Sequence, residues 1–151
     1  MSALATLRAL PPSSPAVIGA VHALAKADRV REQVAIRTQH VIHGGQYHRT
    51  ICIPAGVRLV GALIKVPTTL TVCGHVLLTA GDGDQIELRG YHVLPASAGR
   101  KQAYLALADT WLTMAFATSA KTVAEAEVEF TAEADQLFSR EGENETIITG
   151  E

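Results

Sequence analysis

The sequence has little cysteine, few aromatic residues and a modest share of charge, and these shortages exclude several classes of protein. Two cysteines, Cys52 and Cys73, stand among 151 residues, too few for the disulfide framework of a small secreted domain. Their spacing does not match cysteine-based metal sites, and both lie in apolar runs, where a thiol behaves as a small core residue. We therefore expect a reducing, cytoplasmic setting for the newly made chain.

Charge is scarce and nearly balanced. Asp, Glu, Lys and Arg make up 19% of the residues, and the formal net charge at pH 7 is −2. This balance lacks the basic footprint of a nucleic-acid-binding protein or of a protein attracted to an anionic membrane. No apolar run approaches the roughly 20 residues needed to span a bilayer, and the first residues lack the pattern of a secretory signal. We expect protein partners, and neither nucleic acid nor a membrane.

Hydrophobic residues, by contrast, make up 48% of the chain, enough for one domain with a substantial core. The N-terminal segment, residues 1–33, is expected to carry a helix over residues 15–32. Ser14 offers a hydroxyl for the helix N-cap, and Pro15 suits the first helical position. Val17 and Val21 then follow at helical spacing.

The region 34–120 has the pattern of a β-barrel. Short segments rich in Val, Ile, Leu and Thr alternate with Gly, Pro and Asp breakers, as is typical of short strands joined by turns. No helical pattern intervenes, which favours a barrel or sandwich over alternating strands and helices. The expected strands are 46–53, 58–66, 70–73, 76–79, 85–89, 92–95, 101–107 and 110–118.

A second helix is expected over residues 121–139. Thr122 and Glu125 have the spacing of a capping box, and Ala126 and Phe130 begin an apolar stripe. The last residues, 140–151, are acidic and interrupted by glycine. We expect them to form an extended acidic tail.

The order of breakers within the β region resembles that of a known family. Residues 47–56 end in an Ile-Pro-Ala-Gly run and lead into a strand that ends at Gly61. The pattern continues downstream with Gly74, Asp82-Gly83, Gly90, Pro95 and Ala108-Asp109-Thr110-Trp111. This series resembles the small single-domain cupin-like proteins encoded by tailed bacteriophages and their hosts. The resemblance covers residues 34–130 and implies a mainly β fold, a cupin-like double-stranded β-helix or jelly roll with an N-terminal and a C-terminal helix.

The same resemblance bears on metal binding. Cupin enzymes hold a divalent metal with two or three histidines and a carboxylate inside the barrel, a ligand set suited to Fe, Mn, Ni or Zn. The matching positions here carry residues that are poor ligands for such metals: Ile64, Pro67, Thr68, Gln102 and Phe116. The resemblance therefore implies a lost metal site, with no cofactor and no catalytic residues.

The remaining histidines and one basic pair are secondary candidates. His40 and His48 flank a Gly-Gly turn and His92 lies in an expected strand, so a displaced metal site would use these three. Surface or hydrogen-bonded histidines are the favoured interpretation, because no carboxylate lies in the segment around His40 and His48 to complete a site. Arg100-Lys101 indicates a solvated basic pair, with an acidic partner as the alternative.

A barrel without metal ligands still offers sheet edges and helices on which a neighbour can dock. We therefore expect a non-catalytic structural or interaction protein that forms a homo-oligomer. Jelly rolls are common in viral particles, and the resemblance narrows the role to a virion-associated one, such as capsid decoration or cementing. Two alternatives stay open: a metal-dependent enzyme of dioxygenase or isomerase type with rearranged ligands, and a small-ligand-binding cupin without a metal.

Overall fold

The structure, a computed structural model, describes residues 8–137 and 142–151. It is mainly β with a helix near each end, which confirms the fold class expected from the sequence. The elements follow in the order α1 (Pro15–Asp28), β1 (Thr38–His43), β2 (Gln46–Ile53), β3 (Arg58–Val60), β4 (Thr68–Thr79), β5 (Gln85–Ala96), β6 (Ala103–Ala106), β7 (Thr110–Ala117), α2 (Val123–Phe130), the 3-10 helix η2 (Ala134–Gln136) and β8 (Asn144–Ile148). No helix in these described ranges is long and apolar enough to cross a membrane.

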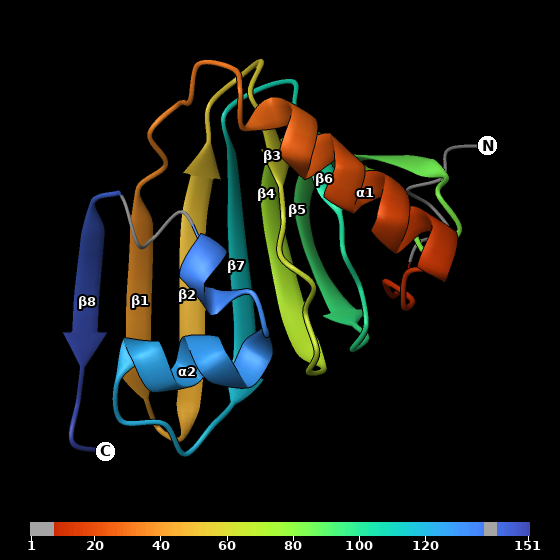
Figure 1. The fold of residues 1–151 in the computed structure, drawn as a ribbon. Helices are drawn as coiled ribbons and strands as arrows, with labels where there is room; N and C mark the ends of the chain where they lie inside the picture. Colours follow the sequence, from red (N-terminus) through yellow and green to blue (C-terminus); the bar gives the residue numbers. More distant parts are fainter. Residues whose placement is uncertain (1–7, 138–141) are drawn as a thin grey trace.

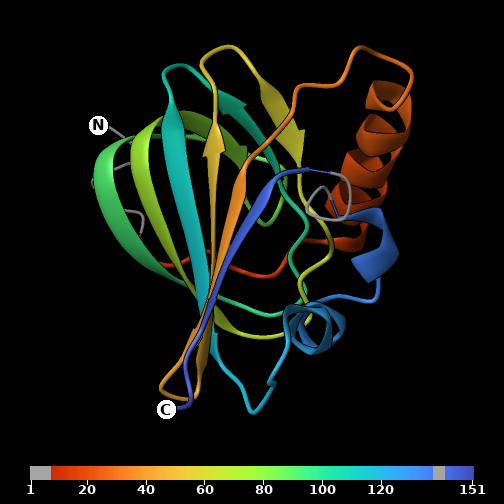
Figure 2. The same cartoon turned by 90° about the vertical axis from the view of Figure 1, so that its left-hand side faces the viewer.

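The strands form one sheet that curls into a half-barrel, with both helices on the same side of it (Figures 1 and 2). Its order is β3-β6-β4-β7-β2-β1-β8, and β5 pairs with β4 outside this path. β4 pairs with β5 along its whole length, with β7 through residues 69–73 and with β6 through residues 76–78. Gly74, with a φ of +146°, lies where β4 changes partner. The sheet therefore turns at Gly74 and encloses an interior.

Buried and exposed residues alternate along the strands, and the buried ones form the main core inside the curled sheet. In β4, Leu70, Val72, Val76 and Leu78 are buried, whereas Cys73 is exposed. A period of two places alternate side chains on the concave face of the sheet, where they join the inward residues of β5, β6 and β7 in one cluster. Full burial of each large aliphatic side chain contributes about 2 kcal/mol.

A second, aromatic cluster fixes α2 against the sheet. The Tyr47 ring centroid lies 5.6 Å from that of Phe116 and 6.3 Å from that of Phe130, and the Phe116 and Phe130 centroids are 6.1 Å apart. Two of these contacts are edge-to-face, the geometry that aromatic quadrupoles favour. Since Phe130 is the last residue of α2, the cluster holds this helix across the ends of β1, β2 and β7 (Figure 1).

Both helices begin where the sequence predicted and end early. The Ser14 Oγ accepts from the Val17 backbone N–H at 3.2 Å and the Thr122 Oγ1 from that of Glu125 at 3.2 Å. The first helix ends at Asp28 rather than at residue 32, and the Gln33 Nε2 donates to the Asp28 carbonyl, one of the carbonyls that the helix end leaves without a helical partner. The second ends at Phe130 rather than at residue 139, since the next residue has an extended backbone.

The expected tail is the largest difference between sequence and structure. Within 142–151, Asn144–Ile148 forms β8, which pairs in parallel with β1. Its Thr146, Ile147 and Ile148 are β-branched and favour a strand, so the prediction of an extended tail was wrong for this part. Residues 1–7 of the expected N-terminal segment lie outside the described residues, as do 138–141, which span the end of the expected second helix and the start of the tail.

Candidate functional site

The concave face of the sheet holds a cavity of about 100 Å³ beside α2. Most of its walls are apolar: Ile51, Leu59, Ile64, Leu70, Leu112, Met114, Phe130 and Leu137. Four polar side chains also reach it, namely Arg49, Arg100, Gln102 and Tyr104. Apolar walls with a few placed polar groups are typical of small-molecule sites, so this cavity is the candidate functional site.

Arg100 is a buried charge whose donors are only partly used. Arg100 is only 2% exposed. One terminal nitrogen donates to the Ser97 carbonyl at 2.9 Å and the other to the Thr68 Oγ1 at 2.7 Å. The Nε has no hydrogen-bond partner among the described residues. Burial lowers the pKa of Arg100, yet a guanidinium stays protonated at neutral pH, so the cavity wall carries a positive charge.

Gln102 and Tyr104 are hydrogen-bonded to each other in the wall of the cavity. The Tyr104 hydroxyl donates to the Gln102 Oε1 at 2.9 Å, and the Gln102 Nε2 donates to the Thr79 carbonyl at 2.9 Å. Burial raises the pKa of Tyr104, which keeps its hydroxyl neutral. Both side chains therefore act as neutral, pre-oriented parts of the cavity wall.

The second arginine of the cavity, Arg49, is paired. Its guanidinium lies 3.2 Å from the Glu127 carboxylate, with side chains only 10% and 4% exposed, and its central carbon lies 5.7 Å from the Phe130 ring centroid. Glu127 belongs to α2 and Arg49 to β2. The ion pair thus neutralises the Arg49 charge and ties α2 to the sheet over the cavity.

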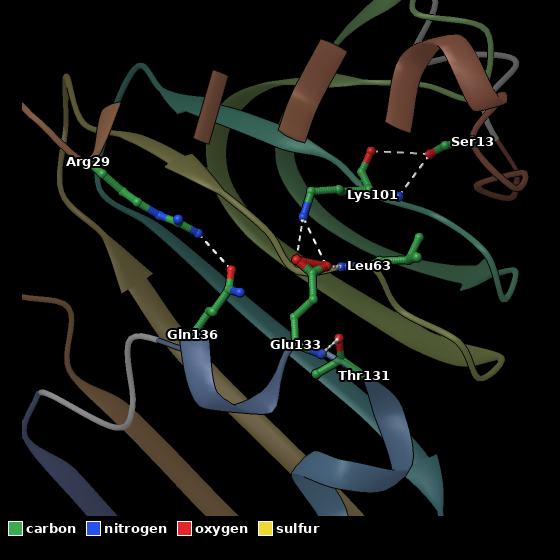
Figure 3. A network of polar contacts seen from close by, with 7 residues as sticks. All are labelled: Ser13, Arg29, Leu63, Lys101, Thr131, Glu133 and Gln136. Carbon is green, nitrogen blue, oxygen red and sulfur yellow. Dashed lines mark hydrogen bonds and ion pairs between the residues drawn. The ribbon is translucent and has the colours of Figure 1, made fainter. Parts of the chain in front are cut away.

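A network around Glu133 holds the segment after α2 in place (Figure 3). The Lys101 Nζ donates to both Glu133 oxygens at 3.0 Å, and the Leu63 backbone N–H donates to one of them at 2.8 Å. The Arg29 guanidinium, just past α1, donates to the Gln136 side-chain oxygen at 2.6 Å. Together these contacts join α1, the β3–β4 connection and η2, so Leu137 stays against the cavity.

Replacing Glu133 with glutamine is expected to lower the free energy of unfolding by about 2 kcal/mol at pH 7. Burial alone would raise the Glu133 pKa, but the Leu63 N–H, Lys101 and, more weakly, His22 hold it below its usual 4.5. A depressed folded-state pKa adds stability above the unfolded value, and this stability is lost as pH falls through the folded value. The difference between wild type and variant, measured by urea unfolding, should therefore shrink from pH 7 to about pH 3.

The exposed Glu32 is the matched control for this prediction. Glu32→Gln should leave the free energy of unfolding unchanged at both pH values, because its side chain is solvated. A Glu133→Gln difference that stays constant with pH would show that the carboxylate charge contributes nothing.

The positions that the resemblance equates with metal ligands fall in different places. Ile64 and Gln102 line the cavity, and Thr68 is buried beside it, bonded to Arg100. Pro67 is exposed, and Phe116 lies in the aromatic cluster. The donor set does not fit a divalent metal, since the cavity's charged groups are guanidiniums, which have no lone pair to offer and repel cations.

The three fallback histidines lie in separate environments. His40 points inward, with its Nδ1 2.7 Å from the Tyr47 hydroxyl and its Nε2 beside the Asn144 Oδ1. His48 bonds to the Gln46 Oε1 at 2.9 Å and His92 to the Arg89 carbonyl at 2.8 Å. Within residues 8–137 and 142–151, no group of three or more His, Cys, Asp or Glu side chains could hold a metal.

His40 itself is a structural histidine in the core. It is 1% exposed, and burial is the main cause that lowers its pKa, which favours the neutral ring. The Asn144 Oδ1 can only accept, so the Nε2 carries the proton and the Nδ1 accepts from Tyr47. This side chain therefore links β1, β2 and the start of β8.

Sequence reasoning missed the role of Arg100-Lys101. The pair was interpreted as solvated, but both residues are buried, and Lys101 pairs with Glu133, which was the acidic-partner alternative. Both residues precede β6, in a run over residues 100–104 in which every residue is buried, so no alternation of buried and exposed positions marks them. Since adjacent cations are normally solvated, the sequence carries no signal for their burial.

Comparisons with known proteins assign no function to this sequence. No family model matches the chain, and no curated protein matches its sequence. Among solved structures, a cupin superfamily protein from Desulfitobacterium hafniense aligns with a TM-score of 0.49 at 12% identity, covering 59% of this chain and 83% of that one. A Streptococcus pyogenes protein of unknown function aligns with a TM-score of 0.46 at 14% identity, covering 59% and 79%.

A cupin domain from Schizosaccharomyces pombe aligns with a TM-score of 0.42 at 14% identity, covering 59% of this chain and 67% of that one. Cupin structures are thus among those that this curled sheet is similar to. At such identities the likeness concerns the fold and assigns neither ligand nor activity. The expected link to bacteriophages stays a prediction.

Proposed function

We propose that this chain is a non-catalytic, cupin-like interaction protein that assembles with copies of itself through the outer face of its sheet. The observation that supports this proposal is a broad surface without charge on the convex side of four adjacent strands. The non-catalytic part is supported by the cavity, whose donor set does not fit a metal.

Three rows of cross-strand neighbours, each running over β2, β7, β4 and β5, make up this surface. Directly opposed residues of antiparallel strands share one face, so the rows follow from the strand pairing. We call these residues the outer patch: Cys52, Trp111, Cys73 and Tyr91; Thr50, Thr113, Thr71 and Val93; His48, Ala115, Thr69 and Pro95. None of the twelve is Asp, Glu, Lys or Arg.

The large residues of the outer patch are exposed to an unusual degree. Trp111 is 55% exposed, Tyr91 is 69% exposed and Val93 is 52% exposed. Interface centres are depleted in charge and enriched in tryptophan and tyrosine, and a contiguous exposed apolar surface commonly marks an interaction site. The composition of the outer patch therefore fits the centre of a protein interface.

A second copy of this chain is the partner that fits best. In a two-fold dimer the same surface meets itself, so any charge near its centre meets a like charge. The outer patch has none, and its Trp111 and Tyr91 can pack against the small Cys73 and Thr71 side chains of a facing copy. A charge-free surface thus supports self-association over binding to an acidic or basic partner.

Replacing Val93 with glutamate is expected to weaken this dimer at least about 30-fold, since a desolvated like-charge pair costs about 2 kcal/mol or more. The wild-type chain should sediment as a dimer, and the Val93→Glu variant as a monomer at the same concentration. Sedimentation velocity over a dilution series measures the change.

Val30→Glu is the matched control, because Val30 is 88% exposed and lies beyond α1, outside the outer patch. It should leave the dimer intact. A wild-type chain that stays monomeric at about 100 μM, or a Val93→Glu variant that stays dimeric, would contradict the proposal. Elemental analysis of the same sample tests the other part, since a metal near one per chain with accompanying turnover would establish the enzyme alternative.

A narrower proposal concerns where the assembly works. The resemblance to phage-encoded cupin-like proteins supports a virion-associated role, with this chain as a capsid decoration or cementing subunit. The test is mass spectrometry of purified particles from cells that produce the chain. Many copies per particle would support the narrower proposal, and absence from the particles would remove it while leaving the self-association intact.

A further inference from the structure

Three cationic side chains are buried at the end of the half-barrel that α2 covers, and they differ in one respect. Arg49 pairs with Glu127 at 3.2 Å and Lys101 pairs with Glu133 at 3.0 Å. Arg100, the third, pairs with no carboxylate of the described residues and bonds to two neutral oxygens instead. Buried charges are normally paired, so the wall of the cavity lacks one negative charge.

We propose that the barrel cavity binds a small monocarboxylate, whose carboxylate pairs with Arg100 and whose short apolar tail packs against the apolar walls. The unpartnered Nε of Arg100 supplies one donor, and a terminal nitrogen now bonded to Thr68 can supply the second. A guanidinium and a carboxylate fit each other through two parallel hydrogen bonds. This site lies on the concave face, opposite the outer patch, and does not depend on the proposed self-association.

Charge balance selects a monoanion. Among the described residues the cavity has one unpaired positive charge, because Glu127 already neutralises Arg49. A phosphate or sulfate dianion would bring a second negative charge next to Ile64, Leu70 and Met114, and no second unpaired cation of the described residues lies there to offset its desolvation. A single carboxylate neutralises Arg100 and leaves the remainder of the ligand free to be apolar.

The volume of the cavity and the chemistry of its walls define the tail of the ligand. The cavity of about 100 Å³ is smaller than the roughly 150 Å³ engineered cavity that holds benzene. A carboxylate of about two to four carbon atoms, with no more heavy atoms than benzene, therefore fits. Gln102 and Tyr104 are already bonded to each other, so hydroxyl or amide groups on the tail gain little, and a plain aliphatic tail is favoured.

The experiment is a titration of the full chain with acetate, propionate, isobutyrate and isovalerate. The ¹H–¹⁵N NMR signal of the Arg100 Nε–H group is monitored during each titration. At least one of these acids should produce a saturable shift of that signal. Isobutyramide has the same shape as isobutyrate without the charge and should bind about 10- to 100-fold more weakly. Inorganic phosphate should also bind more weakly than the best carboxylate.

Arg100→Met removes the charge while retaining the length of the side chain. The variant should lose about 10- to 100-fold in carboxylate affinity and, without ligand, should unfold at an equal or higher temperature, because an unpaired buried charge is removed. Arg89→Met, at an exposed position of β5, is the matched control and should bind as wild type. A purely structural Arg100 would instead make Arg100→Met less stable and leave binding absent in both proteins.

Three results would overturn the proposal: no saturable shift with any of the four acids, isobutyramide binding as tightly as isobutyrate, or phosphate binding most tightly. Carboxylate binding that survives in Arg100→Met would overturn it as well. Should that variant fail to fold, the comparison of isobutyrate with isobutyramide on the wild-type chain decides alone.

Discussion

Replacing Glu127 with alanine is expected to lower the free energy of unfolding by about 3–5 kcal/mol. The substitution leaves the Arg49 guanidinium, which is 10% exposed, without the carboxylate that lies 3.2 Å away. Removing one partner of a buried ion pair is far more damaging than removing the pair, because the remaining charge keeps its desolvation penalty. Urea unfolding measures the change, with the slope on denaturant checking that both proteins unfold in one step.

Two further variants separate this effect from the loss of a side chain. Glu143→Ala breaks the pair with Arg37, in which both side chains are largely solvated, and should change the free energy of unfolding by less than about 0.5 kcal/mol. The double variant Arg49→Met with Glu127→Leu replaces the buried pair with apolar groups and should recover most of the stability. A Glu127→Ala variant as stable as wild type would contradict the assigned role of the ion pair in holding α2.

The local signals in the sequence were sufficient for the helix starts and for most strands. Ser14 and Thr122 act within a few residues of themselves, so their capping follows from spacing alone. The strand 46–53 was predicted with its observed bounds, Gln46–Ile53, because turn residues delimit it on both sides. Local chemistry of this kind does not depend on the rest of the fold.

The sequence reasoning fell short on the length and number of the strands. β4 and β5 were each expected as two strands, since Gly74 and Gly90 were taken as breaks, but these glycines face each other within one continuous ladder. β1 was missing from the expected strands, and it is held by β2 on one side and β8 on the other. The local signal that could have placed β1 is the Gly44-Gly45 turn, which joins it directly to β2 in a hairpin.

The sequence identified two positions of the candidate site but not the charge of the site. Family resemblance placed Ile64 and Gln102 at ligand positions, and both line the cavity. The charge of the site, a buried Arg100 that pairs with no carboxylate of the described residues, became visible only in the structure. Whether a cation is paired depends on Glu127 and Glu133, which come from a helix and a turn that the strand pattern does not place. Sequence shows which groups exist, and packing decides which of them remain unpaired.

Replacing Gly74 with alanine is expected to lower the free energy of unfolding by about 3 kcal/mol or more. Gly74 has a φ of +146°, and a Cβ there would lie 2.6 Å from the Thr110 Oγ1, 2.7 Å from the Thr110 Cα and 2.8 Å from the Asp109 carbonyl oxygen. Two of these three atoms are backbone, so no side-chain rotation relieves the clash. Because β4 passes from β7 to β6 at this residue, a shift here disturbs both pairings.

Gly90→Ala is the matched control for this prediction, since Gly90 is the residue paired with Gly74 across the ladder. It also has a positive φ, +90°, but no atom lies within 4 Å of the Cβ that alanine would add. Its substitution should cost about 1–2 kcal/mol through backbone strain alone. Urea unfolding of the two variants therefore isolates the steric part, and equal losses at both positions would mean that the close approach of Thr110 to Gly74 does not shape the bend of the sheet.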